Sequence, residues 1–270
     1  MLHVIQKAFR KKKDPVESVK APASNLSNAE KSLEPKKTIV EKKEFPNGIS
    51  IQWFEKGNGE PVSDGEVYEL NFKVKLTNGE VVDGNHRLHR DWLPFLAGYG
   101  MQTKGWDLAM KELHVGDFAE VFIPANLARG EKGIPGYIPP HSPNIVMIRV
   151  GKKINPTRIA GKTKVWLLEE QADVKDSIVG PNSNVSIHYF VGSKSNPKYD
   201  NSYHRQEPFT FNMKDNGILP GLKKALAGAK LSDKMYILID PSEAYGKNGF
   251  LDRVKPNESI FYDLMIMEVK

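Results

Sequence analysis

Residues 105–110 read GWDLAM and residues 221–226 read GLKKAL, with glycine first, alanine fifth and a large apolar residue last in both. The two segments are 221 − 105 = 116 residues apart. The same offset relates Arg129-Gly130 to Tyr245-Gly246. A period of this length indicates a duplicated domain, because solenoid repeats are only about 20–50 residues long. Each copy, at about 100 residues, is large enough to bury a core of its own.

Most of the chain around these segments alternates apolar and polar residues, as strands do when one face meets a core. The predicted strands are 67–76, 118–123 and 145–150 in the first copy and 165–168, 185–191, 235–239 and 260–269 in the second. Asn78-Gly79 is a strong hairpin signal. Helical spacing occurs near 106–113, with Gly116 as terminator, and near 222–229. Sheets packed on single short helices predict an α+β fold.

The first 45 residues have a different composition. They carry eleven Lys or Arg and six Asp or Glu, so 11 − 6 = +5 of the net charge of +6 lies there. With few large apolar residues, such a segment cannot offset its ordering entropy. We therefore predict a disordered basic tail over 1–45, with order beginning near Gly48, and folded domains over 46–154 and 155–270 joined by a linker at 155–161.

Two interpretations of the tail remain open. A basic arm can contact nucleic acid or an anionic membrane surface through its charge. This tail, however, mixes acidic residues with its bases and lacks interleaved aromatic residues. The composition favours a solvated linker, with nucleic-acid contact as the less favoured alternative.

Composition also excludes several classes of site. The chain has no cysteine, which excludes disulfides, zinc–thiolate sites and thiol nucleophiles. No apolar run approaches the roughly 20 residues of a membrane span. The apolar run 1–9 precedes the basic run 10–13, the reverse of a secretory signal, so we expect a cytoplasmic protein. The histidines in predicted loops lack metal-ligand spacing, and we expect neither metal nor cofactor; these are His86, His89 and His204.

Short motifs flank the repeated segments in each copy. In the first they are Asn78-Gly79, Val82-Asp83, Phe95, Lys104-Gly105-Trp106-Asp107, Val115-Gly116-Asp117 and the run from Gly133 to His141. In the second they are His188-Tyr189, Gly192, Tyr199-Asp200-Asn201-Ser202, Pro208-Phe209-Thr210-Phe211, Ile218-Leu219-Pro220-Gly221-Leu222 and Glu243-Ala244-Tyr245-Gly246. In this order and spacing, the motifs resemble the FKBP family of peptidyl-prolyl isomerases over residues 48–270.

The resemblance implies two tandem FKBP-like domains, each a curled antiparallel β-sheet wrapped on one short α-helix, with a ligand pocket between sheet, helix and loops. It also implies isomerisation of X–Pro bonds during protein folding, with prolyl-containing polypeptides as partners. The alternative is a chaperone or adaptor that binds prolyl segments with little or no turnover.

An apolar pocket suits this reaction. Rotation about an X–Pro bond faces a barrier of about 20 kcal/mol because amide resonance must be lost. The twisted amide has lost much of its dipole, so a water-poor site favours it over the planar ground state. A few fixed hydrogen bonds then hold the carbonyl, and no covalent intermediate is needed.

By resemblance, the second copy supplies the more complete site. Tyr189, Phe209, Tyr262 and Leu222 would line the pocket, with Tyr199 and Phe211 beside them, and Ile218 and Leu219 would present backbone groups to the peptide. Tyr245 would donate its hydroxyl to a substrate carbonyl, and Asp200 would be a polar handle paired with Arg205. Phe250 and Val254 would close the loop side. Leu222 stands where the family usually has tryptophan.

The first copy keeps Asp83, Trp106, Ile138 and the Pro139-Pro140 loop as candidate substrate contacts. It departs from the family at four positions. Phe72 replaces the usual tyrosine and lacks its hydroxyl, and Val82 replaces an aromatic wall residue. Thr103 stands where an isoleucine is expected, and Arg129 replaces the hydroxyl-donating tyrosine. We therefore expect activity mainly in the second copy, and a weak isomerase or an inactive binding module in the first.

Overall fold

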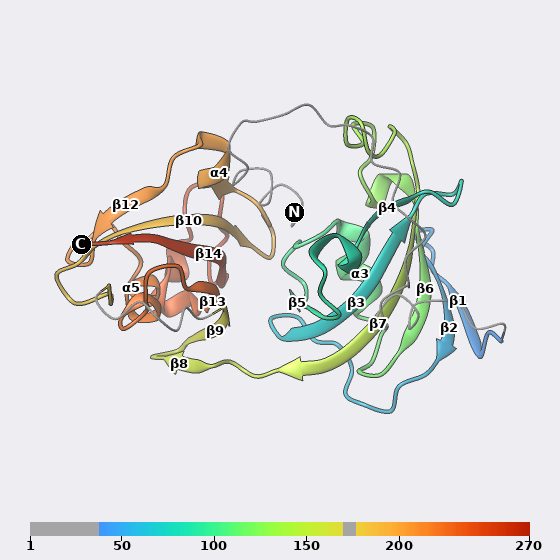
Figure 1. The fold of residues 1–270 in the computed structure, drawn as a ribbon, viewed down its shortest axis with the longest axis horizontal. Coiled ribbons are helices and arrows are strands. Elements are labelled where there is room, and N and C mark those ends of the chain that lie inside the picture. Colours follow the sequence, from blue (N-terminus) through green and yellow to red (C-terminus); the bar gives the residue numbers. More distant parts are fainter. Residues whose placement is uncertain (1–37, 170–176) are drawn as a thin grey trace. The chain divides into compact units, whose positions relative to one another are not determined.

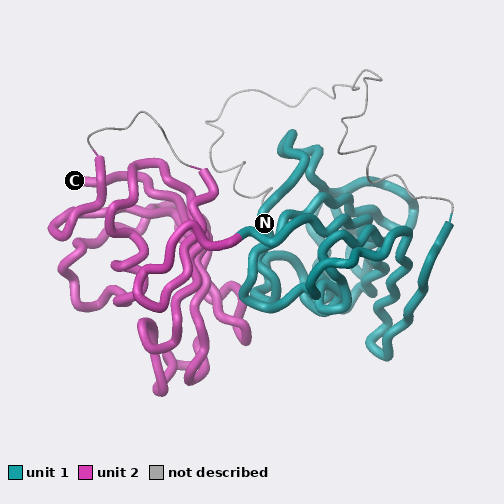
Figure 2. Tube along the Cα trace, turned by 90° about the horizontal axis from the view of Figure 1, so that it is seen from below, with its two compact units in different colours: residues 1–154 teal, residues 155–270 magenta. Residues whose placement is uncertain are grey.

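The computed structural model describes residues 38–169 and 177–270 (Figure 1). The chain divides into two compact units between Ile154 and Asn155 (Figure 2). Residues 1–37, most of the predicted tail, lie outside the described residues.

Unit one is an antiparallel sheet of seven strands in the order β1-β2-β6-β7-β3-β4, with β5 also paired to β3. The strands are β1 (Glu41–Glu44), β2 (Ser50–Glu55), β3 (Val67–Lys75), β4 (Val81–Gly84), β5 (Leu93–Leu96), β6 (Phe118–Ile123) and β7 (Asn144–Ile154). The helical segments are α3 (Lys104–Met110) and the 3-10 turns η1 (Asn85–Leu88) and η2 (Ala125–Leu127). Figure 1 shows α3 beside the sheet. A Cβ on Gly105 would lie 2.3 Å from Ile123 Cγ2, so glycine lets α3 approach β6 closely.

Unit two repeats this plan with the strand order β11-β10-β14-β13-β9-β8 and with β12 paired to β10. The strands are β8 (Arg158–Ala160), β9 (Thr163–Glu169), β10 (Asn184–Ser193), β11 (Asp200–Asn201), β12 (Phe209–Asn212), β13 (Lys234–Ile239) and β14 (Ile260–Val269). The helical segments are α4 (Ser202–Arg205), α5 (Pro220–Leu226), η3 (Pro241–Glu243) and η4 (Gly246–Asn248). Both units thus have the α+β architecture that the sequence predicts.

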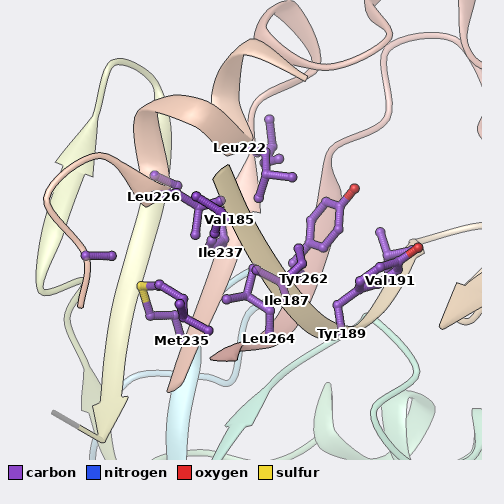
Figure 3. Packing of buried hydrophobic residues seen from close by; sticks show 14 of the residues in the cluster. Val185, Ile187, Tyr189, Val191, Leu222, Leu226, Met235, Ile237, Tyr262 and Leu264 are labelled. Carbon is purple, nitrogen blue, oxygen red and sulfur yellow. The ribbon is translucent and has the colours of Figure 1, made fainter. Parts of the chain in front are cut away.

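Alternation along the strands builds the core of unit two. Val185, Ile187, Tyr189 and Val191 follow one another at every second position of β10 and all belong to one buried cluster. Figure 3 shows them with Leu222 and Leu226 of α5 and with side chains of β13 and β14. The rings of Tyr189 and Tyr262 lie at one end of this cluster and Met235 at the other.

Three local expectations need correction. Residues 41–44, predicted to be part of the disordered tail, form β1, because their backbone pairs with the open edge of β2 although all four side chains are exposed. The predicted linker contains β8, which pairs with β9. The helices lie at 104–110 and 220–226, two residues earlier than their predicted starts. In α5 the reason is Pro220, which suits the first turn of a helix.

The described residues were predicted to contain neither a membrane span nor a metal site. Within 38–169 and 177–270, no helix is long and apolar enough to cross a membrane. Nor does any cluster of three or more potential metal-ligating side chains occur in that part of the chain.

Candidate functional site

A network of three polar side chains lies at the edge of the core of unit two. The Tyr189 hydroxyl donates to Asp200 Oδ2 at 2.5 Å, and Arg205 Nη2 donates to the Tyr189 hydroxyl at 2.9 Å. Arg205 Nη1 closes the triangle by an ion pair with Asp200 Oδ1. The contact expected between Asp200 and Arg205 is therefore present. β10, β11 and α4 each supply one member, so the sheet and the short helix together determine its geometry.

The network fixes the protonation of its members. Burial alone would raise the pKa of Asp200, but hydrogen bonds from Tyr189 and Arg205 and the charge of Arg205 outweigh it and hold the pKa below its ordinary value. Burial, and then the hydrogen bond to Asp200, raise the pKa of Tyr189 to about 12. At neutral pH the site therefore holds a carboxylate and a protonated phenol.

Aromatic rings surround this network. The Phe209 ring meets the Tyr189 ring edge-on at 6.2 Å between centroids, and the Tyr262 ring lies 5.7 Å from Tyr189 at a tilt of 60°. Phe209 is 39% exposed, whereas Phe211, stacked on it at 5.4 Å, is buried in the core. Of the two phenylalanines predicted to contact substrate, Phe209 is thus accessible and Phe211 supports it.

Tyr199 and Tyr245 pack against the same cluster from the loop side. The Tyr245 ring stacks on Phe250 at 4.6 Å, with an angle of 14° between the planes. The Tyr199 hydroxyl oxygen is buried and forms no hydrogen bond of ordinary geometry with any described residue. Burial raises the pKa of Tyr245, and a weaker interaction with the Tyr199 hydroxyl lowers it. The Tyr199 hydroxyl is therefore buried beside the Tyr245 hydroxyl without a well-formed hydrogen bond.

The start of α5 presents backbone groups. The Leu219 carbonyl accepts the Lys223 amide at 3.1 Å and is thus used by the helix. The Leu219 amide makes no hydrogen bond with any residue in the described ranges. Of the backbone groups predicted at Ile218 and Leu219, the Leu219 carbonyl is therefore occupied, whereas the Leu219 amide has no partner in the described part of the chain.

The predicted floor and loop positions also surround the cluster. Leu222 and Val254 are each 2% exposed, and both belong to the core of unit two. Phe250 faces Val254 across a β-bridge in which the Phe250 amide donates to the Val254 carbonyl at 2.9 Å. Ile218 and Leu219 are partly buried against the same core. The structure therefore gathers all of the candidate residues of the second copy around one apolar cluster.

Both units match one known protein family. The family model described as FKBP-type peptidyl-prolyl cis-trans isomerase matches residues 58–150 and again 175–267. The chain belongs to the FKBP-type peptidyl-prolyl cis-trans isomerase family. The first match begins within unit one and the second within unit two, so each unit is an FKBP domain.

Several named proteins and one solved structure are similar to this chain. Mouse peptidyl-prolyl cis-trans isomerase FKBP10 is 23% identical over 207 residues, which are 77% of this chain and 35% of that protein. FK506-binding protein 4 of Rhizopus delemar is 37% identical over 95 residues, 35% of this chain and 24% of its own. This chain thus spans about a third or less of these relatives. A crystal structure of the three FKBP domains of wheat FKBP73 covers 83% of this chain and 96% of its own at 19% identity, with a TM-score of 0.41.

The FKBP domain of unit one has different polar groups. Asp83 lies on β4, which pairs with β3. In the same way, Asp200 lies on β11, which pairs with β10. Trp106 is buried, with its ring 5.0 Å from Phe72 in an edge-on contact and 6.0 Å from Phe95. Ile138 is buried beside a bridge to Ile134. The apolar walls are retained, but Phe72 offers no hydroxyl to the carboxylate.

Two supporting features of the unit-two FKBP domain have little signal in the sequence. A Cβ on Gly192 would lie 2.1 Å from the Pro197 carbonyl oxygen, so glycine lets β10 touch the loop that carries Tyr199. Ser202 Oγ accepts from the Tyr189 amide at 2.8 Å and lies 2.9 Å from His188 Nδ1. Burial lowers the pKa of His188.

Replacing Tyr199 with phenylalanine is expected to raise the melting temperature of unit two by about 4–8 °C, since a buried hydroxyl without a partner costs about 1 kcal/mol or more. Tyr189→Phe is the matched control, because its hydroxyl is hydrogen-bonded and its loss should lower the melting temperature. Thermal unfolding followed by circular dichroism distinguishes the two. A lower melting temperature for Tyr199→Phe would contradict the assignment of an unused hydroxyl.

Proposed function

We propose that this chain catalyses cis–trans isomerisation of X–Pro bonds in polypeptides, with the activity mainly in unit two. The observation that supports this most is the Tyr189–Asp200–Arg205 network beside a cluster of aromatic rings. The network places hydrogen-bonding groups of fixed protonation state beside an apolar surface. Rotation of an amide requires both.

Each group has a role in this proposal. The prolyl ring packs on the apolar cluster near Tyr262 and Leu222, where little water remains to stabilise the planar amide dipole. The open amide of Leu219 and the hydroxyl of Tyr245 donate to carbonyl groups of the peptide. Asp200 orients Tyr189, which in turn holds the wall of the site in place. No proton is transferred and no covalent bond forms.

The proposal can be tested with the full chain and a short X–Pro peptide in a protease-coupled assay. We expect acceleration over the uncatalysed rate in proportion to the protein concentration. The double variant Tyr245→Phe with Asp200→Leu should lower kcat/KM about 1,000-fold, since the loss of Asp200 costs about 2.7 kcal/mol and the loss of the Tyr245 hydroxyl about 1.4 kcal/mol. Arg129→Gln in unit one is the matched control and should change kcat/KM less than about twofold.

A folded chain that gives no acceleration would refute the proposal. In that case the alternative, a prolyl-peptide-binding chaperone or adaptor, predicts that the same chain suppresses aggregation of a client without turnover. Loss of activity in the Arg129 variant but not in the double variant would place the reaction in unit one instead.

A further inference from the structure

A buried carboxylate joins three elements of unit two. Glu243, the last residue of η3, is 7% exposed. Its Oε1 accepts from Lys224 Nζ of α5 at 2.6 Å, and its Oε2 accepts from Thr163 Oγ1 of β9 at 2.6 Å and from the Lys162 amide at 3.1 Å. The hydrogen bonds from Lys224 and Thr163 hold the pKa of Glu243 below its ordinary value, so the group is a carboxylate at neutral pH.

Two glycines make room for this carboxylate. A Cβ on Gly161, whose φ is +70°, would lie 2.3 Å from Glu243 Oε1. A Cβ on Gly221, in the first turn of α5, would lie 2.7 Å from Thr163 Oγ1 and 3.2 Å from Glu243 Cβ. The turn before β9 and the start of α5 can therefore approach Glu243 closely only because neither position carries a side chain.

The other end of α5 is held separately. Arg158 Nη1 of β8 donates to the Lys224 carbonyl at 3.3 Å, and its Nη2 donates to the carbonyls of Ala225 and Ala227. α5 has only seven residues, and a helix of that length is not stable by itself. Its position therefore depends on such anchors, and the contact between Lys224 and Glu243 is the anchor toward η3.

The two segments that Glu243 joins carry groups with roles in the proposed reaction. Tyr245, the proposed hydroxyl donor, follows Glu243 by two residues. Leu219, the proposed amide donor, immediately precedes α5. The placement of one donor relative to the other therefore depends on how η3 lies against α5.

Unit one has the same backbone arrangement without the ion pair. Leu108 and Leu127 stand 116 residues before Lys224 and Glu243. A Cβ on Gly105 of α3 would lie 3.3 Å from Leu127 Cβ, much as a Cβ on Gly221 would lie 3.2 Å from Glu243 Cβ. Apolar residues at both positions are thus compatible with the fold. Since burying a carboxylate costs desolvation that its ion pair must first offset, stability alone does not account for Glu243.

We propose that Glu243, through its ion pair with Lys224, is a positioning residue for prolyl isomerisation in unit two. Charge-assisted hydrogen bonds fix direction as well as distance, whereas apolar contacts allow neighbouring segments to slide. The pair keeps the Tyr245 hydroxyl and the Leu219 amide at the separation that a twisted peptide needs, and a misplacement of about 1 Å is enough to slow a reaction markedly. This inference rests on the function proposed above.

The test uses the full chain in the protease-coupled assay, with kcat and KM measured separately. Lys224→Met removes the ammonium but keeps a side chain of similar length, and it leaves Glu243 bonded to Thr163 and the Lys162 amide. We expect kcat to fall about 10-fold with KM within about twofold of wild type, because the donors are needed most in the transition state. Lys224 is half exposed, so the melting temperature of unit two should fall by less than about 8 °C.

Further variants separate positioning from stability. Lys224→Arg keeps the ion pair and should retain kcat within about twofold. Glu243→Gln should lower kcat as Lys224→Met does, and the two changes together should cost less than about twofold more than either alone, because both break one contact. Asp233→Ala is the matched control. It removes a buried carboxylate just before β13, whose Met235 lies at the end of the core away from Tyr262 (Figure 3), and it should lower the melting temperature by a similar or larger amount with kcat unchanged.

A wild-type chain that gives no acceleration would overturn both the proposed function and this inference. Acceleration by the wild type with unchanged kcat in Lys224→Met and Glu243→Gln would overturn the inference alone. An equal loss of kcat in Asp233→Ala would also overturn it, since loss of stability would then explain the effect. So would losses that multiply in the double variant, because they would show that the two side chains act independently.

Discussion

Replacing Asp200 with leucine is expected to lower kcat/KM for X–Pro isomerisation about 100-fold, a loss of about 2.7 kcal/mol in transition-state stabilisation. The carboxylate accepts from the Tyr189 hydroxyl and pairs with Arg205. Leucine would leave both donors without their acceptor at the edge of the aromatic cluster, so Tyr189 would lose its fixed orientation. The steady-state rates of the variant and of the wild-type chain, measured at matched concentrations, give this ratio directly.

Asp200→Asn provides the matched control. The amide keeps an acceptor for Tyr189 but loses the charge that pairs with Arg205, so we expect a loss of only about 10-fold. Asp83→Leu, the equivalent change in unit one, should leave kcat/KM within about twofold of wild type. If Asp200→Leu stays folded and remains within twofold of wild type, the network has no part in the reaction.

The largest effect on stability is expected for Asp117→Ala in unit one. This carboxylate is fully buried and accepts three hydrogen bonds: from Trp53 Nε1 at 2.9 Å, from the Gly57 amide at 2.6 Å and from the His114 amide at 3.0 Å. Alanine would leave three buried donors without a partner, at a cost of about 4 kcal/mol. We expect the melting temperature of unit one to fall by about 15–25 °C.

The duplication supplies the control for this prediction. Asp233 lies 233 − 117 = 116 residues later and is also buried, but it accepts one hydrogen bond, from the Lys230 amide at 2.8 Å. Its Oδ1 has no partner in the described part of the chain. Asp233→Ala should therefore lower the free energy of unfolding by only about 1–2 kcal/mol, and the loss should occur in unit two. Hydrogen exchange of β6 and β13 assigns each loss to its unit, and equal losses would contradict the hydrogen-bond account.

The two units illustrate how one fold supports different sites. β3 and β4 of unit one carry Phe72 and Asp83 where β10 and β11 of unit two carry Tyr189 and Asp200. Phe72 offers no hydroxyl to Asp83, whose ion pair with Arg87 spans 3.9 Å, and Arg129 stands where unit two has Tyr245. The backbone is thus shared while the polar chemistry differs.

Much of the candidate site could be predicted from the sequence. The order of motifs indicated Tyr189, Asp200, Phe209 and Tyr245 as neighbours, and the structure gathers them around one cluster. The use of the Leu219 carbonyl by α5 could not be predicted, because it depends on where the helix begins. The unused hydroxyl of Tyr199 has no signal in the sequence either, since burial and the absence of a partner are set by segments distant in the chain.

The sequence by itself determined the duplication, the strand-rich α+β class and the residue types of both sites, because the 116-residue offset and the two-residue alternation are local and periodic. Only the tertiary structure decided that residues 41–44 form a strand, since nothing apolar in that segment requires it and the open edge of β2 supplies its hydrogen bonds. The same holds for the pairing of the polar groups. Whether a guanidinium meets its acceptors depends on distances of a few ångströms between β10, β11 and α4, which the order of residues does not specify.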